Sequence, residues 1–206
     1  LDRITNMEQL SSLLKQYDEA VTQTAQQIEM VKQNIQQYAN MLQNTAQLPA
    51  NLVSELKGRL SQLASLTSQL KTLRGDVTSL GEIFSRLYPE QGLFSDLAGA
   101  SPERVEAAVA QYKASWDSWS ENVDRAAQAA FQLSGAQLSE LQKDSSKFDS
   151  YLDNLLSTPD GQMKAIMAGN NLAALQVQES RQLRELMATQ VQNSISSQMK
   201  TEKESQ

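Results

Sequence analysis

The sequence predicts an all-α protein, an elongated bundle of long antiparallel helices with a small helical or loop appendage at one end. Apolar residues recur with heptad spacing over most of the chain, and only 8 Gly and 4 Pro interrupt its 206 residues. No segment shows the apolar alternation that is typical of strands. We therefore expect a single elongated helical domain over residues 1–206, with a smaller lobe at about 80–112 and a frayed tail at 200–206.

The first predicted helix runs from about Ile4 to Thr45, and two apolar rows follow it with heptad spacing. One row is Met7, Leu14, Val21, Ile28, Ile35 and Leu42, and the other is Leu10, Tyr17, Thr24, Val31 and Tyr38. Such a seam is buried only against other helices, and either the same chain or a second copy can supply them. Leu48-Pro49 ends the helix, because the residue before a proline avoids helical geometry.

The second predicted helix starts near Pro49 and carries its own heptad rows. These are Leu56, Leu63, Leu70, Val77 and Phe84, with Leu66, Leu73, Leu80 and Leu87. Gly58, Gly75 and Gly81 fall inside the helix, and each weakens it by about 1 kcal/mol relative to Ala. We expect a firm helix to about Arg74, followed by a kink or a restart.

The main break of the pattern lies between Tyr88 and Ala100, and an unusually apolar set of residues surrounds it. The set comprises Phe84, Leu87, Tyr88, Leu93, Phe94 and Leu97. These residues either cap the end of the bundle or form a docking patch, since contiguous exposed apolar surface usually marks an interface. They are our candidate partner-binding residues.

The third predicted helix begins at Ser101-Pro102-Glu103, a good helix start, and runs towards Leu156. Its heptad phase slips by one residue near Ser134-Gly135, which predicts a local unwinding or a short break. Trp116 and Trp119 lie three residues apart on its apolar rows. We expect this pair in the core, and the alternative is a recognition platform.

The fourth predicted helix begins at Thr158-Pro159-Asp160, a second cap-and-proline start, and runs to about Met199. Its apolar positions are less regular than those of the first helix. They are Met163, Ile166, Leu172, Leu175, Leu183, Leu186 and Met187.

The composition argues against an enzyme. The chain has no His and no Cys, which removes thiol nucleophiles, Ser-His-Asp catalysis and nearly every transition-metal site. The acidic residues lack the spacing of a calcium loop, and no glycine-rich phosphate loop is present. We expect no catalytic residues, no cofactor and no metal.

The charge and hydropathy limit the partners further. The formal net charge is −6 and the sequence pI is about 4.8, whereas nucleic-acid binders need clustered Lys and Arg. We expect no direct contact with nucleic acid. No apolar run approaches the roughly 20 residues that span a bilayer, so we expect no transmembrane segment.

Two stretches of the chain resemble a known family. The first is Tyr38-Ala-Asn-Met-Leu-Gln-Asn44 followed by Leu48-Pro49. The second is Thr158-Pro-Asp-Gly-Gln-Met-Lys-Ala-Ile-Met-Ala-Gly-Asn-Asn-Leu-Ala-Ala-Leu-Gln176, which continues through Gln182-Leu-Arg-Glu-Leu-Met187. Together they resemble the TrbJ-type conjugative-transfer proteins, which are relatives of the minor pilin subunit of type IV secretion systems.

The resemblance implies a non-enzymatic minor pilus or assembly component of a conjugative type IV secretion system. Such proteins are exported to the periplasm, so a signal peptide is expected to have been removed before Leu1. The implied location is the periplasm, with the extracellular pilus tip or the base of pilus assembly as the final place. The implied partners are the major pilin and the polytopic inner-membrane channel subunit, with self-association and the recipient-cell surface as further contacts.

The rival interpretation is a generic secreted or scaffolding coiled-coil module that is unrelated to conjugation. It predicts self-association through the first helix and no role in DNA transfer.

Overall fold

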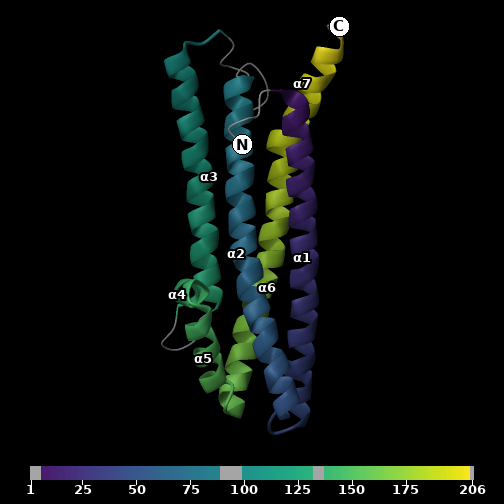
Figure 1. Cartoon of the computed structure of the whole chain (residues 1–206), viewed down its shortest axis with the longest axis vertical. Helices are drawn as coiled ribbons and strands as arrows, with labels where there is room; N and C mark the ends of the chain where they lie inside the picture. Colours follow the sequence, from purple (N-terminus) through teal and green to yellow (C-terminus); the bar gives the residue numbers. More distant parts are fainter. Residues whose placement is uncertain (1–5, 89–98, 132–136, 205–206) are drawn as a thin grey trace. The chain divides into compact units, whose positions relative to one another are not determined.

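The computed structural model describes residues 6–88, 99–131 and 137–204, and these form helices with no strand among them. The predicted all-α class is confirmed. The helices are α1 (Met7–Asn44), α2 (Ala50–Leu87), α3 (Pro102–Ala130), α4 (Leu138–Lys143), α5 (Ser145–Leu155), α6 (Pro159–Leu186), the π-helical segment η2 (Met187–Gln192) and α7 (Asn193–Glu204) (Figure 1).

The chain divides into two compact units, and α1, α2, α3 and α6 each contribute to both. Unit 1 comprises residues 1–22, 71–122 and 181–206, and unit 2 comprises residues 23–70 and 123–180. The described part of the expected lobe at 80–112 falls within unit 1. Residues 89–98 lie outside the described part, so a separate lobe stays a prediction, as does fraying of the tail at 200–206.

Unit 2 buries the second half of the α1 seam against α2, α5 and α6. Ile28, Ile35 and Leu60 are fully buried there. The rings of Phe131 and Phe148 stack with centroids 6.5 Å apart. This burial confirms the predicted heptad seam, because its apolar rows supply the core of the unit.

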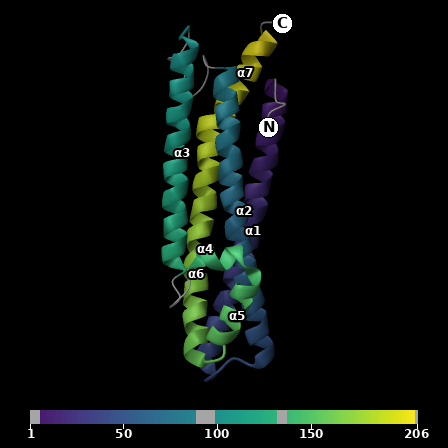
Figure 2. The same ribbon diagram turned by 60° about the vertical axis from the view of Figure 1, so that its left-hand side comes forward.

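Unit 1 buries the first half of the seam, and parts of α1, α2, α3 and α6 lie side by side in it (Figure 2). Its core residues are Met7, Leu10, Leu14, Val21, Val77, Leu80, Phe84, Tyr112, Trp116, Leu183, Met187, Val191 and Ile195. The apolar rows of α1 are thus buried by other helices of the same chain in both units.

The second helix is more continuous than predicted, since α2 runs through Gly75 and Gly81 to Leu87 without interruption. Gly75 is exposed, with no atom near the position of an added Cβ. At Gly81 the missing side chain makes room for the Tyr112 ring, whose hydroxyl an added Cβ would overlap. Burial of Val77, Leu80 and Phe84 outweighs the cost of about 1 kcal/mol at each glycine.

The third helix is less continuous than predicted, because α3 ends at Ala130 and two shorter helices follow. The predicted slip near Ser134-Gly135 lies outside the described residues. A further break at Asp144 was not predicted. There the backbone is extended (φ −132°, ψ 98°), and the Asp144 side chain caps α5 by accepting a hydrogen bond from the Lys147 backbone N–H (3.1 Å).

The predicted start of the last helix is confirmed. Thr158 caps α6, with its Oγ1 accepting a hydrogen bond from the Gly161 backbone N–H (3.1 Å), and Pro159 takes the first position. The helical path then changes at Met187, where six residues adopt π-helical geometry before α7 begins. Such π segments are rare and often accompany functional sites.

Candidate docking groove

The six candidate partner-binding residues have different surroundings in the structure. Phe84 is fully buried in the core of unit 1, and its ring lies 5.8 Å from that of the half-buried Tyr88. Leu87 is exposed, with 40% of its surface accessible. Leu93, Phe94 and Leu97 lie outside the described residues. The set therefore stays a prediction, and within it Phe84 has a packing role while Leu87 is open to a partner.

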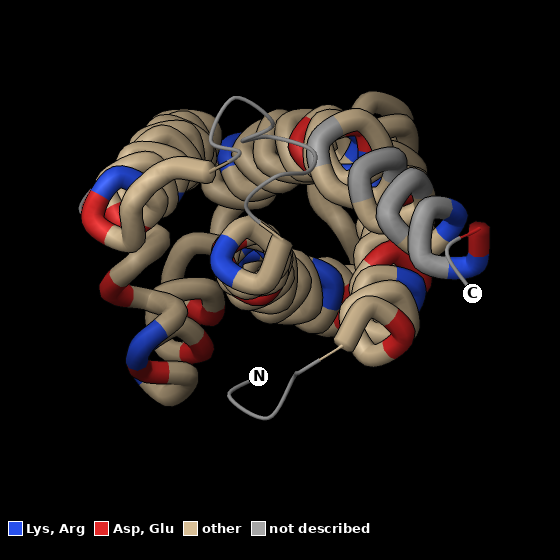
Figure 3. Tube along the Cα trace, turned by 90° about the horizontal axis from the view of Figure 1, so that it is seen from above, with Lys and Arg blue, Asp and Glu red and all other residues tan. Residues whose placement is uncertain are grey.

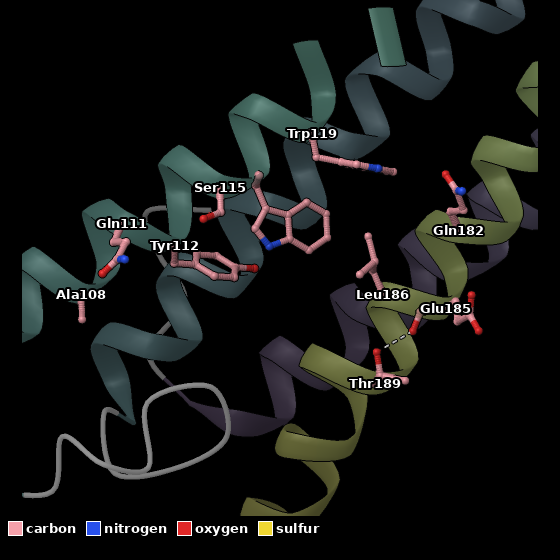
Figure 4. A pocket seen from close by; sticks show the side chains of 10 residues that line it. Ala108, Gln111, Tyr112, Ser115, Trp119, Gln182, Glu185, Leu186 and Thr189 are labelled. Atoms are coloured by element: carbon pink, nitrogen blue, oxygen red, sulfur yellow. Dashed lines mark hydrogen bonds between the residues drawn. The ribbon is translucent and has the colours of Figure 1, made fainter. Parts of the chain in front are cut away.

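A groove of about 790 Å³ opens in unit 1 between α3 and the part of the chain where α6 passes into η2 (Figure 4). Its size is that of a typical ligand or peptide site. The residues that line it are Ala108, Gln111, Tyr112, Ser115, Trp116, Trp119, Gln182, Glu185, Leu186 and Thr189.

Each wall of the groove is one face of a helix. The residues from α3 recur every three or four positions from Ala108 to Trp119, and those of the opposite wall do so from Gln182 to Thr189. At 1.5 Å per residue, the α3 wall is about 16 Å long, or three turns. Two such parallel stripes are the arrangement that a third helix meets when it packs against a helix pair.

Aromatic rings dominate the α3 wall. The Trp116 ring lies between Tyr112, at a centroid distance of 5.9 Å, and Trp119, at 5.8 Å with nearly perpendicular ring planes. Trp116 is buried and Trp119 is half-buried. The expected core position is confirmed for Trp116, and both tryptophans also line the groove.

The opposite wall supplies Leu186 and the single charged side chain among the described lining residues, Glu185. In the part of the chain that the structure describes, the Glu185 carboxylate makes no ion pair. Its neighbour Arg184 contacts Asp18 of α1 instead, with Nε 3.2 Å from Oδ1. Thr189 donates a hydrogen bond to the Glu185 backbone carbonyl (2.9 Å), which bridges the change from α6 to η2.

Burial raises the pKa of the Tyr112 phenol well above its usual value, and the nearby negative charge of Glu82 adds to the effect. The folded state thus favours the neutral phenol. This contribution to stability is complete below the unfolded-state pKa of about 10 and is lost as the pH rises towards the higher folded-state value.

We therefore expect the free energy of unfolding to fall above about pH 10, and to fall less steeply in Tyr112→Phe. The difference in slope approaches about 1.4 kcal/mol per pH unit, the value for one group. Urea unfolding of both proteins at a series of pH values between 8 and 11.5 measures it. In Tyr151→Phe, which removes a half-buried phenol of unit 2, most of the fall should persist. Equal slopes in the original protein and Tyr112→Phe would contradict this assignment.

The charged residues of the described helices form no metal-binding cluster. Figure 3 shows the two signs of charge interspersed along the described helices. No group of three or more acidic side chains gathers there in a way that could hold a metal ion. None of the described helices is long and apolar enough to cross a membrane.

The groove was not predicted from the sequence, although both of its tryptophans were singled out. The α3 wall left a signal, since Ala108 and Ser115 place small residues beside the aromatic row. The other wall consists mainly of polar residues, and their pattern in the sequence is that of any solvent-exposed helix face. Only the pairing of the two helices makes Glu185 and Leu186 part of a site.

The two stretches that carry the family resemblance meet in unit 2. The Leu48 backbone N–H donates a hydrogen bond to Oε1 of Gln162 (3.2 Å), which joins the first stretch to the second. Two residues of this segment thus have structural roles. Thr158 caps α6, and Gln162 joins the start of α6 to the segment that follows α1. Comparison of the chain with known protein families, with curated proteins and with solved structures finds no match.

Proposed function

We propose that this chain is a non-enzymatic component of pilus assembly in a conjugative type IV secretion system. It is exported to the periplasm and contacts the major pilin and the polytopic inner-membrane channel subunit. The observation that carries the proposal is the resemblance of residues 38–44, 48–49, 158–176 and 182–187 to the TrbJ-type proteins. The hydrogen bond between Leu48 and Gln162 supports it, because it joins the two resembling stretches.

The described surface suits a protein that acts by contact. Long helices hold side chains on rigid faces, and the open groove beside Trp119 and the exposed Leu87 are the apolar features of unit 1. The net charge of −6 favours protein partners over nucleic acid. Burial of the α1 seam inside the chain counts against the rival coiled-coil module, which needs that seam for self-association.

Deleting the gene from a donor cell should abolish both conjugative transfer and adsorption of pilus-specific phage, because a missing assembly component prevents a pilus from forming. Returning the exported protein should restore both. Loss of transfer with retained phage adsorption would instead place the protein at a later step, such as contact with the recipient. Unchanged transfer and adsorption would overturn the proposal and leave the generic coiled-coil module.

A surface substitution sharpens this experiment. Leu87→Asp places a charge on an exposed residue at the end of α2 and should lower transfer at least about tenfold if partners dock there. Met30→Asp is the matched control, since Met30 is an exposed apolar residue of unit 2 (63% accessible). Circular dichroism should show equal helicity for both. Equal transfer by the two variants would remove Leu87 from the docking surface.

A further inference from the structure

We propose that the groove between α3 and the α6–η2 segment binds an amphipathic α-helix of a partner protein, with a basic residue of that helix facing Glu185. The inference names the chemistry of one contact within the proposed function, and it rests on that function for the identity of the partner.

The shape of the groove specifies a helix. Its walls are helical faces of three turns on α3 and about two turns on the opposite side, running from Ala108 to Trp119 and from Gln182 to Thr189. A helix laid between them presents residues at i, i+3, i+4 and i+7 to both stripes at the same period. Ala108 and Ser115 are small, so a partner backbone can approach α3 closely at these two positions.

The apolar anchors of the groove lie towards the Trp119 end of its α3 wall. Trp116 and Trp119 belong to the α3 wall. Leu186 points from α6 towards α3 (Figure 4). Tryptophan is enriched among the residues that carry most of the binding energy of protein interfaces. Leucine-sized side chains on the partner helix fit between these three anchors.

The negative charge of the groove favours a basic residue on the partner helix. Glu185 is the one charged residue among the described lining residues, and Arg184 is directed to Asp18. A Lys or Arg on the partner can pair with the Glu185 carboxylate. An acidic partner would be repelled by Glu185 and by the net charge of −6.

The chain supplies its own probe for this binding. Its two tryptophans are Trp116 and Trp119, and both line the groove. All tryptophan emission of the intact protein therefore comes from residues that line the groove. The ligand to use is a synthetic helical peptide of about four turns, free of tryptophan and tyrosine, with leucine at i, i+3, i+4 and i+7 and lysine beside that stripe. Its twin carries glutamate in place of each lysine.

We expect the lysine peptide to change the tryptophan emission saturably, with a dissociation constant about tenfold lower than that of the glutamate twin. Glu185→Lys should reverse this preference. Glu8→Lys is the matched control, because Glu8 is an exposed acid of unit 1 outside the groove, and it should leave the preference unchanged. Leu186→Asp should weaken both peptides about tenfold or more, while circular dichroism shows intact helices.

Several results would overturn the inference. The inference fails if neither peptide changes the emission. It also fails if Glu185→Lys keeps the preference for the lysine peptide. Emission that changes with protein concentration alone, together with a dimer in sedimentation, would assign the groove to a second copy of the chain. If deletion of the gene abolishes transfer but the peptides do not bind, only this inference fails. If the peptides bind as expected but transfer is unaffected by deletion, the proposed function fails and the groove serves another partner.

Discussion

Gly169→Val should lower the free energy of unfolding by about 3 kcal/mol, because it places a branched side chain where two other helices meet α6. A Cβ at this position would lie 2.8 Å from Cδ2 of Leu60 in α2 and 3.0 Å from Cδ1 of Ile35 in α1. Both neighbours are fully buried, so neither methyl group can move into solvent. Urea unfolding followed by circular dichroism measures the change.

Gly58→Ala is the matched control for this prediction. Gly58 lies inside α2, is exposed and has no atom within 4 Å of an added Cβ. Alanine there should stabilise the protein by about 1 kcal/mol through helix propensity alone. Gly169→Ala should fall between the two, because the same gain in propensity opposes a smaller overlap.

A compensating substitution tests the mechanism directly. Leu60→Ala removes the methyl group that the new valine would meet, so Gly169→Val and Leu60→Ala together should destabilise the protein by less than the sum of their separate effects. Strict additivity, or a Gly169→Val protein as stable as Gly58→Ala, would show that close approach of the helices is not the reason for glycine at this position.

The fold could be predicted because its causes are local and periodic. The heptad rows of α1 recur in the buried residues from Met7 to Ile35, and Thr158-Pro159 marks the start of α6 by cap chemistry. The continuity of α2 could not be predicted in this way. Gly81 weakens an isolated helix, and only the Tyr112 ring, which comes from another helix, shows why glycine is useful there.

The groove lies beyond sequence reasoning for a related reason. Trp116 and Trp119 were recognised as apolar positions, and each satisfies the rule that an aromatic row faces the core. A groove requires that the neighbouring helix stand away from part of that row. The helix that does so, and the placing of Glu185 and Leu186 in the opposite wall, depend on the packing of segments distant in the chain.

Gln162→Met should lower the free energy of unfolding by about 3 kcal/mol, although methionine matches glutamine in length and volume. Gln162 is fully buried. Its Oε1 accepts a hydrogen bond from the Leu48 backbone N–H (3.2 Å), and its Nε2 donates one to the Leu156 carbonyl (3.1 Å). Methionine would fill the space and leave both backbone groups without these partners. Urea unfolding measures the loss.

Gln142→Met provides the comparison. The Gln142 Nε2 donates to the Ala64 carbonyl (3.0 Å) and to Ser68 Oγ (3.1 Å), but its side chain is only half-buried. Water can replace the amide there, so the cost should stay below about 1 kcal/mol. Equal costs for the two substitutions would show that burial of the Gln162 amide does not matter.

Gln162→Glu separates the two hydrogen bonds, because a carboxylate can still accept from the Leu48 N–H but cannot donate to the Leu156 carbonyl. Burial disfavours the charged form and raises the pKa of the new carboxyl above its unfolded value of about 4.3. The variant should therefore be closest to the original protein below about pH 4 and lose stability as the pH rises through the folded-state pKa. If the stability of Gln162→Glu had the same pH dependence as that of the original protein, the backbone segments at Leu48 and Leu156 would have moved apart to admit water. In that case, Gln162 would not be the residue that ties the end of α1 to the start of α6.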